Sequence, residues 1–181
     1  MTETGGFPPV PGYFFVLSRP KKTLSLEEYH NWYNTEHGPL RMRLGFFPEG
    51  SRYRSRDLDP TAWLATYDVA SLACFDDPRY ITLRENRSSR EQKLIDHGLG
   101  QLDRRIYKNL SSRGESGGPA PVIMAVIFVV KEDLVDELHA WYEEVEVRPL
   151  LEIAPSYLVA GAFGRHIEDS RMASKSKIRI D

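Results

Sequence analysis

The residues best suited to chemistry are two histidines and a tyrosine, His30, Tyr33 and His37, in the segment 26–40. At about 100° per residue they fall on one line of a helix together with several leucines, whereas Trp32 lies off that line. An apolar stripe that carries two imidazoles and a phenol must either satisfy them within the core or line a cavity. His30 and Tyr33 fit both interpretations, so we treat them as candidates for substrate contact.

His37 is the main candidate for catalysis because of its place in the chain. It lies in Glu36-His37-Gly38-Pro39, at the end of the predicted helix, where the backbone opens and a pocket can reach the ring. An imidazole titrates near neutral pH and serves as a general acid or base. We therefore expect His37 to transfer a proton, with Tyr33 as a second catalytic residue. The alternative is that His37 only packs in the core.

No metal site is expected. His30 and His37 are seven residues apart, which is roughly 10 Å along a helix and too far for both to share one ion. The sequence contains neither HExxH nor an acid–histidine cluster at ligand spacing. It also lacks a phosphate-binding loop, the dinucleotide fingerprint GxGxxG and the hydrolase elbow GxSxG. We therefore predict chemistry without a metal or another cofactor.

Two further polar residues are candidates for substrate binding. Arg52 belongs to the alternating segment SRYRSR, where an arginine either holds a carboxylate or phenolate or lies on a solvated rim. Asp68 interrupts an apolar segment, where it either orients a histidine or ends a strand. The charged run 84–93, by contrast, is expected to be the solvated face of a helix.

Composition excludes several classes of protein. The net charge of −2 gives no electrostatic funnel for nucleic acid, and a single cysteine, Cys74, excludes a disulfide framework and a cysteine-based zinc site. The N-terminus shows no signal pattern, and the longest apolar run, 121–130, is far shorter than the ~20 residues of a membrane span. We expect a soluble, cytoplasmic protein without a nucleic-acid or membrane partner.

Periodicity places the candidates on a series of strands and helices. A helix over 26–40 begins after Thr23 or Ser25, and Pro39 ends or kinks it. The other expected elements are strands at 13–18, 51–56, 63–69 and 102–110 and a long amphipathic helix at 75–97. The order β-α-β-β-α-β over roughly 100 residues is that of the ferredoxin-like α+β fold.

The pattern then starts again. The segment 111–121 is rich in Gly, Pro and Ser, as linkers are. YHNWYNTEHGPL in the first helix returns as LHAWYEEVEVRPL in the second half, with His, Trp, Tyr, Pro and Leu in the same order. We interpret this as an internal duplication. The second half is expected to form a strand at 122–130, a helix at 134–151 and a strand at 157–163.

The second copy differs from the first in chemistry and in completeness. His139 and Tyr142 match His30 and Tyr33, but Glu146 stands where the first copy has His37, so the second copy is expected to be a structural partner. The expected organisation is an N-terminal arm (1–11), a complete repeat (12–110), the linker (111–121), a partial repeat (122–165) and a polar tail (166–181).

A partial repeat leaves the apolar strand 122–130 without the strand that would join it to its neighbour in the sheet. The unpaired backbone groups of such an edge strand can pair with another chain. Three explanations stay open. The tail supplies a strand through Ile178 and Ile180, another chain completes the sheet, or the chain is part of a longer protein. We favour the third and expect the tail to be poorly packed.

These motifs together resemble a known family. The helix motif HxWYxxEHxPL, the Arg-Tyr-Arg strand, WLATYDVAS and LDRRIY are similar to the EthD-type branch of the dimeric α+β-barrel superfamily, and in particular to its fungal tandem-repeat proteins of secondary metabolism. The resemblance covers residues 12–110 well and 122–165 partly.

The resemblance implies a four-stranded sheet that packs against another such sheet, either in a homodimer or as an intramolecular pseudo-dimer. It implies a cofactor-independent enzyme that decarboxylates, dehydrates or cyclises an aromatic polyketide-like acid. His37 would then be the general acid, with Tyr33 beside it and His30, Arg52 and Asp68 around the substrate. The alternatives are an aromatic-ligand-binding or accessory protein of an oxidative pathway, and a degenerate structural duplicate.

Overall fold

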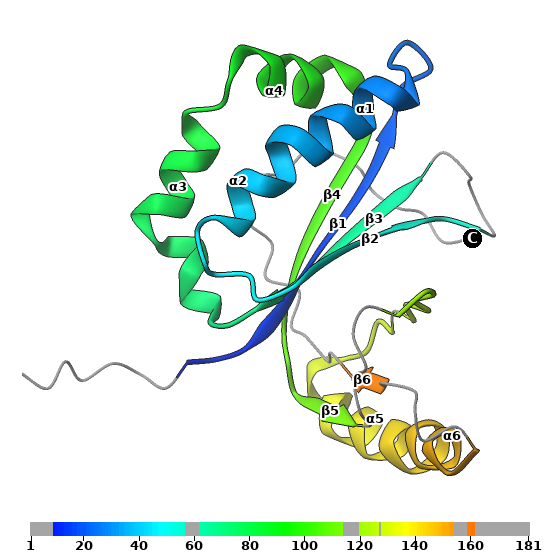
Figure 1. Cartoon of the computed structure of the whole chain (residues 1–181). Coiled ribbons are helices and arrows are strands. Elements are labelled where there is room, and N and C mark those ends of the chain that lie inside the picture. The colour runs from blue at the N-terminus through cyan, green and yellow to red at the C-terminus, as the bar shows by residue number, and fades with distance from the viewer. Residues whose placement is uncertain (1–8, 57–61, 114–119, 127, 154–158, 162–181) are drawn as a thin grey trace, which may run out of the picture. The chain divides into compact units, whose positions relative to one another are not determined.

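A computed structural model describes residues 9–56, 62–113, 120–126, 128–153 and 159–161 (Figure 1). The chain divides into two compact units, and the described residues up to Lys108 belong to the first and those from Asn109 to the second. Each unit is described by itself. Among the described residues, no helix is long and apolar enough to cross a membrane.

The first unit is built on one four-stranded antiparallel sheet. Its strands are β1 (Gly12–Pro20), β2 (Gly50–Arg54), β3 (Trp63–Val69) and β4 (Leu99–Lys108). Their order is β2-β3-β1-β4, with β1 in the centre paired to β3 and β4. Together with the helices between them, this is the ferredoxin-like β-α-β-β-α-β arrangement, and the predicted fold class is confirmed.

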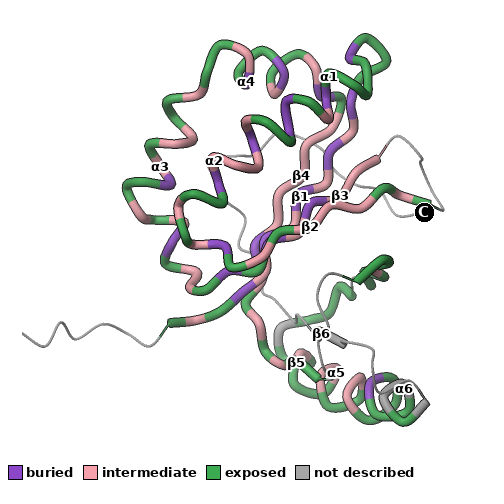
Figure 2. Tube along the Cα trace, in the orientation of Figure 1, coloured by how far each residue is buried: buried purple, intermediate pink, exposed green. Residues whose placement is uncertain are grey.

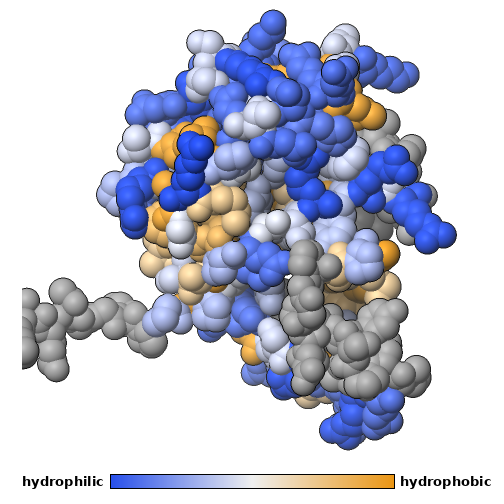
Figure 3. Space-filling model, in the orientation of Figure 1, coloured by the Kyte–Doolittle hydropathy of each residue, from blue (hydrophilic) through white to orange (hydrophobic). Residues whose placement is uncertain are grey.

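The helices cover one face of this sheet (Figure 1). Burial alternates along β1 (Figure 2). Phe14 and Val16 belong to the buried core, whereas their neighbours in the strand are half-buried on the other face. The register puts Phe14 beside Tyr67 of β3 and Ile106 of β4, and all three side chains are buried. Over α1 and α4 the outer surface is mostly hydrophilic (Figure 3), as expected for helices with one buried stripe.

The first helical segment runs further than predicted and contains a wide turn. It consists of α1 (Leu26–Trp32), a π-helical turn η1 (Tyr33–His37) and α2 (Gly38–Met42). Ser25 is the N-cap, and its hydroxyl accepts from the backbone of Glu28. Pro39 does not end the helix, because it lies in the first turn of α2, where a missing N–H does little harm.

The predicted apolar stripe was wrong in part. Trp32, which was placed off the stripe, is only 2% exposed, whereas Leu26 is 48% exposed. The buried face is centred on Tyr29, Trp32 and Tyr33, so it is rotated from the predicted line. In the π turn each backbone hydrogen bond spans five residues rather than four, so a uniform 100° per residue also fails from Tyr33 onward.

The second helical region is broken rather than one long helix at 75–97. It contains a 3-10 turn η2 (Leu72–Asp76), α3 (Pro78–Glu85), α4 (Ser89–Lys93) and a π turn η3 (Leu94–Gly98). The break has local causes, since Asp77 caps α3 and Ser88 caps a new helix, α4, after the chain leaves helical geometry at Asn86. The break directs Glu91 inward, as described below.

The second unit contains a helical segment and a short strand pair. Its elements are β5 (Ser111–Arg113), η4 (Glu132–Leu134), α5 (Val135–Tyr142), the π turn η5 (Glu143–Val147), α6 (Arg148–Ile153) and β6 (Val159–Gly161). β5 pairs with β6, so the predicted linker begins with a strand. The predicted strand 122–130 is wrong for its described residues, which form no ladder and, apart from the half-buried Ile123, are exposed. A strand needs a partner for its backbone groups.

Both halves of the chain contain the order helix, π turn, helix. α5 is one residue longer than α1, and the five-residue turn and the following proline-containing helix then match. In this structural alignment the inserted residue lies before the turn, so Val147, and not Glu146 as predicted, takes the place of His37. The duplication itself stays a prediction. The tail 166–181 and residues 1–8 of the arm lie outside the described residues.

Candidate functional site

A buried charged cluster lies between the helices and the sheet of the first unit. The ring Nδ1 of His37 is 2.8 Å from Glu91 Oε1, and Arg41 Nη2 is 3.5 Å from the same oxygen. Arg41 also donates to the backbone oxygen of His37 at 2.9 Å. Each of these three side chains is at most 5% exposed. Glu91 therefore ties α4 to the π turn and α2.

The ionisation of this cluster follows from burial and from Arg41. Burial first, and the Arg41 charge second, lower the pKa of His37 to about 3, although Glu91 acts in the opposite direction. Burial raises the pKa of Glu91, but the hydrogen bond from His37 and the charge of Arg41 outweigh burial and bring it below its usual value. At neutral pH His37 is therefore a neutral ring that donates from Nδ1 to an ionised Glu91.

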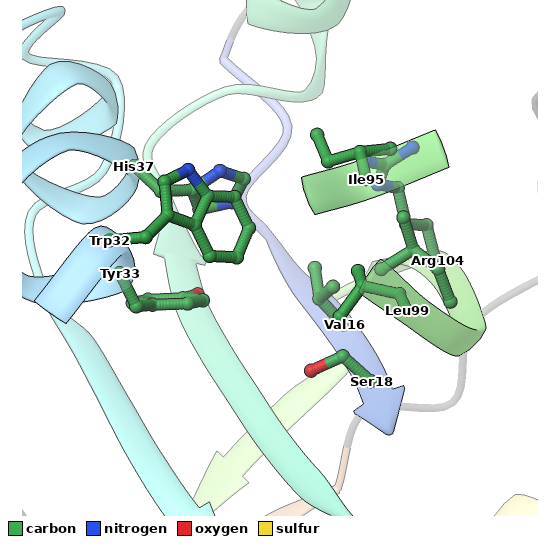
Figure 4. Close-up of a pocket in the computed structure, with 9 residues that line it drawn as sticks. Val16, Ser18, Trp32, Tyr33, His37, Ile95, Leu99 and Arg104 are labelled. Atoms are coloured by element: carbon green, nitrogen blue, oxygen red, sulfur yellow. The ribbon is translucent and has the colours of Figure 1, made fainter. Parts of the chain in front are cut away.

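His37 does not fit the predicted role of a protonated acid. It faces a cavity of about 10 Å³ that Trp32, Tyr33 and Arg104 also line (Figure 4). Such a volume is close to that of a single water-sized probe, far too small for an aromatic ring. The His37 ring also packs against Trp32 and Tyr33 at tilted angles, with centroid distances of 4.5 and 4.9 Å. The histidine is held among the core aromatics.

The Tyr33 hydroxyl makes a close contact with a second phenol. Tyr33 Oη is 2.6 Å from Tyr67 Oη, and both side chains are buried. Burial raises the pKa of both hydroxyls, so both are protonated at neutral pH. One phenol donates to the other, and the accepting phenol retains a hydrogen for a third group. The pair can therefore donate a hydrogen bond to an oxygen placed beside it.

Arg52 of β2 is held over the ring of Tyr33. Its Nη1 donates to Asn34 Oδ1 at 2.8 Å and its Nη2 to His30 Nδ1 at 2.6 Å. The guanidinium carbon lies 4.1 Å from the Tyr33 ring centroid, a cation–π contact. Among the described residues, no carboxylate forms an ion pair with Arg52. Within the described residues its positive charge is thus oriented but not neutralised.

His30 supports Arg52 and does not reach the cavities. Burial first, and the Arg52 charge second, lower the pKa of His30. Because Nδ1 accepts from Arg52, the ring is neutral with its hydrogen on Nε2. The ring also packs edge to face on Trp63 at a centroid distance of 4.3 Å. His30 is thus a positioning residue for the guanidinium.

A pocket of about 300 Å³ opens between the π turn, α2 and the strands β2 and β3. Its lining residues are Tyr33, Asn34, Gly38, Pro39, Met42, Gly50, Ser51, Arg52 and Tyr67. The tyrosine hydroxyl pair and Arg52 supply polar groups, whereas Pro39 and Met42 are apolar. The volume lies at the lower end of the range for small-molecule sites. A π turn beside such a site is a frequent arrangement.

The structure brings together only some of the predicted site residues. Tyr33 and Arg52 line the pocket and His30 contacts Arg52, whereas His37 faces the smaller cavity. Asp68 is exposed on the opposite face of the sheet, because it alternates with the buried Tyr67 and Val69. Asp68 therefore orients neither histidine. The residue that orients His37 is Glu91.

Sequence reasoning missed Tyr67, Asn34 and Glu91. The alternating pattern of WLATYDV could have predicted that Tyr67 is buried. It could not predict its hydrogen-bond partner Tyr33, which is 34 residues away in the chain. Glu91 was included in the charged run 84–93, which was expected to be solvated, yet it is 2% exposed. The N-cap Ser88, which starts α4 and places Glu91 in its first turn, was the available signal.

The described part of the second unit does not repeat the site. His139 Nε2 lies 3.3 Å from Ser111 Oγ and 3.6 Å from Glu143 Oε1, and the serine hydroxyl donates to Glu143. In a catalytic triad the serine and the carboxylate contact different nitrogens of the histidine ring. Here Glu143 lies near the same nitrogen as Ser111 and also accepts from the serine hydroxyl, so the three residues do not form a triad. In the part of the chain that the structure describes, no group of three or more potential metal ligands comes together.

Comparison with known proteins adds little. No protein family model matches the sequence, and no curated protein matches it either. Among solved structures, the chain is similar to the "Putative antibiotic biosynthesis monooxygenase from Nitrosomonas europaea", with 13% identity over 58% of this chain and 95% of that chain and a TM-score of 0.37. A likeness of this size says nothing about function. The fold assignment rests on the strand order of the first unit.

Proposed function

We propose that the first unit binds a small aromatic carboxylic acid in the pocket between the π turn, α2, β2 and β3. The observation that carries the proposal is Arg52, a cation held at the pocket by two neutral acceptors, Asn34 and His30. Neutral partners orient a guanidinium but leave its charge for a ligand. An arginine so placed favours planar anions such as carboxylates.

The other walls of the pocket suit a hydroxylated ring. The hydroxyls of Tyr33 and Tyr67 offer a hydrogen to a ligand oxygen, and Pro39 and Met42 supply apolar contact. Small-molecule sites combine a few polar groups with an apolar lining in this way. The resemblance to EthD-type proteins of secondary metabolism agrees with a phenolic acid as the ligand.

A second candidate function is a cofactor-independent reaction of the bound acid, and the tyrosine pair favours it. In such a decarboxylation a proton from solvent adds to the ring carbon that bears the carboxylate. The carbon–CO2 bond then breaks, and its electrons restore the aromatic ring and leave negative charge on a ring oxygen. Tyr33 and Tyr67 would stabilise the charge that grows on a ring oxygen. His37, being neutral and enclosed, has no part in this scheme.

The resemblance also bears on assembly. The sheet face away from the helices carries half-buried Phe15, Leu17 and Leu64. We propose that this face packs on another sheet, in a homodimer or an intramolecular pseudo-dimer. Light scattering on the full chain tests the homodimer, since a monomeric mass at all concentrations would contradict it.

The binding proposal is tested by titrating the protein with 2,4-dihydroxybenzoate, followed by calorimetry. Arg52→Gln should weaken binding roughly 10- to 150-fold, because a charge-assisted hydrogen bond is worth about 1.5–3 kcal/mol. Arg54→Gln is the matched control, since it removes the same charge from an exposed position on the same strand. Equal affinities of the two variants would contradict the proposal. Product analysis with Tyr67→Phe tests the reaction, which should slow without an equal loss of binding.

A further inference from the structure

The hydrogen bond between Arg52 and His30 determines the protonation state of the histidine. A guanidinium carries donors and no acceptor, so the His30 Nδ1, at 2.6 Å from Arg52 Nη2, must accept. A histidinium has a hydrogen on both ring nitrogens and can accept at neither. Arg52 therefore makes this hydrogen bond only while His30 is neutral.

The other acceptor of Arg52 does not titrate. Asn34 Oδ1 accepts from Arg52 Nη1 at 2.8 Å, and a side-chain amide stays neutral. Protonation of His30 would leave the guanidinium with this one acceptor and place a second positive charge at hydrogen-bond distance from it. Like charges at such a distance repel each other strongly. A protonated His30 thus displaces Arg52 from its place over the Tyr33 ring.

The surroundings of His30 leave Arg52 as its charged neighbour. The histidine is half-buried, so protons from solvent reach the ring. Tyr29 of α1 and Trp63 of β3 pack edge to face against it, at centroid distances of 5.2 and 4.3 Å. Burial raises the pKa of the Tyr29 hydroxyl, which therefore stays neutral. Burial first and the Arg52 charge second lower the pKa of His30, and among the described residues no other charge shifts it.

A ligand in the pocket has no contact that would offset this repulsion. Arg52 and Asn34 line the pocket, whereas His30 does not. A ligand carboxylate there meets the guanidinium and not the imidazole, so it cannot bridge the two cations. A proton on His30 therefore removes the cation that holds the ligand and supplies no new contact in its place.

We infer that His30 couples this pocket to pH, so that the pocket holds its acid at neutral pH and releases it in mild acid. The inference rests on the proposed function and adds its regulation. His30 acts through Arg52 and is a positioning residue. Because coupling is reciprocal, the ligand must weaken proton binding to His30 by the factor by which the proton weakens the ligand. A bound acid should thus lower the pKa of His30, although a negative charge nearby ordinarily raises it.

The test is calorimetry on the full chain with 2,4-dihydroxybenzoate at pH 7.5 and pH 5.0, with circular dichroism to verify the fold at both. The ligand stays mostly ionised, since carboxyl groups titrate near about 4. The affinity of the wild type should fall roughly three- to tenfold, within the limit of about tenfold per pH unit that one proton sets. His30→Gln keeps an acceptor for Arg52 but does not titrate, so its two affinities should agree within about twofold. His97→Gln removes an exposed histidine and should show the same fall as the wild type.

A second measurement needs no variant. An NMR pH titration of the His30 ring should give a lower pKa with saturating 2,4-dihydroxybenzoate than without it. An unchanged or raised pKa would overturn the inference, and so would an equal fall of affinity in His30→Gln and the wild type. The proposed function fails separately, if Arg52→Gln and Arg54→Gln bind equally well at pH 7.5. An affinity that depends on Arg52 but not on pH would overturn the coupling alone.

Discussion

Acid should destabilise the first unit through His37, and the size of the effect follows from its burial. The pKa of His37 is about 3 in the folded protein and 6.5 in the unfolded chain. Between these values the unfolded chain binds more protons than the folded one, so the stability falls as the pH falls from 6.5 toward 3. For a single group, the linkage relation gives a loss of about 2 kcal/mol between pH 7 and pH 5.

The assay is urea unfolding at pH 7 and pH 5, followed by circular dichroism. His37→Gln keeps an N–H donor for Glu91 but does not titrate, so its stability should fall by about 2 kcal/mol less than that of the wild type. His97→Gln removes an exposed histidine and should behave like the wild type. His30, whose pKa is also lowered, leaves some pH dependence in the His37 variant.

Two results would refute this reasoning. The same loss in His37→Gln and in the wild type would show that His37 does not carry the effect. A gain of stability at pH 5 that disappears in His37→Gln would show that the Glu91 carboxylate outweighs burial and raises the pKa of the ring. In that case His37 would be the imidazolium that the sequence first suggested.

Three other changes test separate parts of the structure. Glu91→Ala should cost about 3–5 kcal/mol in urea unfolding, because it leaves buried Arg41 without its carboxylate, whereas Glu85→Ala, at an exposed position, should cost less than about 0.5 kcal/mol. Tyr67→Phe removes the hydroxyl partner of Tyr33 and should cost about 1 kcal/mol in the same assay; an unchanged stability would show that the two hydroxyls are not bonded. Ser25→Ala removes the cap of α1 and should cost about 1 kcal/mol, with the loss of helix visible by circular dichroism.

Several strands and a helix cap of the first unit could be predicted from local sequence patterns. Strand β3 was predicted with its observed bounds, and β1, as 13–18, from a run that is apolar on both faces, because side chains of a strand point to opposite faces in turn. The cap at Ser25 was among the two positions predicted. These features depend on residues close together in the chain. The break before α4 was local as well, but the charged run obscured it.

The strand 122–130 shows where a local pattern fails. Its residues have the composition of a buried strand, yet the described ones form none. A strand exists only if a neighbour accepts its backbone hydrogen bonds. The composition of a segment indicates how readily it forms a strand, but it does not indicate whether a neighbouring strand is present.

The sequence by itself determined the fold class and the residue types available to the pocket, because periodicity and capping act over a few positions. Only the tertiary structure decided what those residues do. His37 became a neutral core residue because Glu91, 54 positions away, and Arg41 enclose it. Arg52 became the cation of a pocket because the pairing of β2 with β3 lays it over Tyr33. Charge and access depend on burial and on distant neighbours, and these exist only in the folded chain.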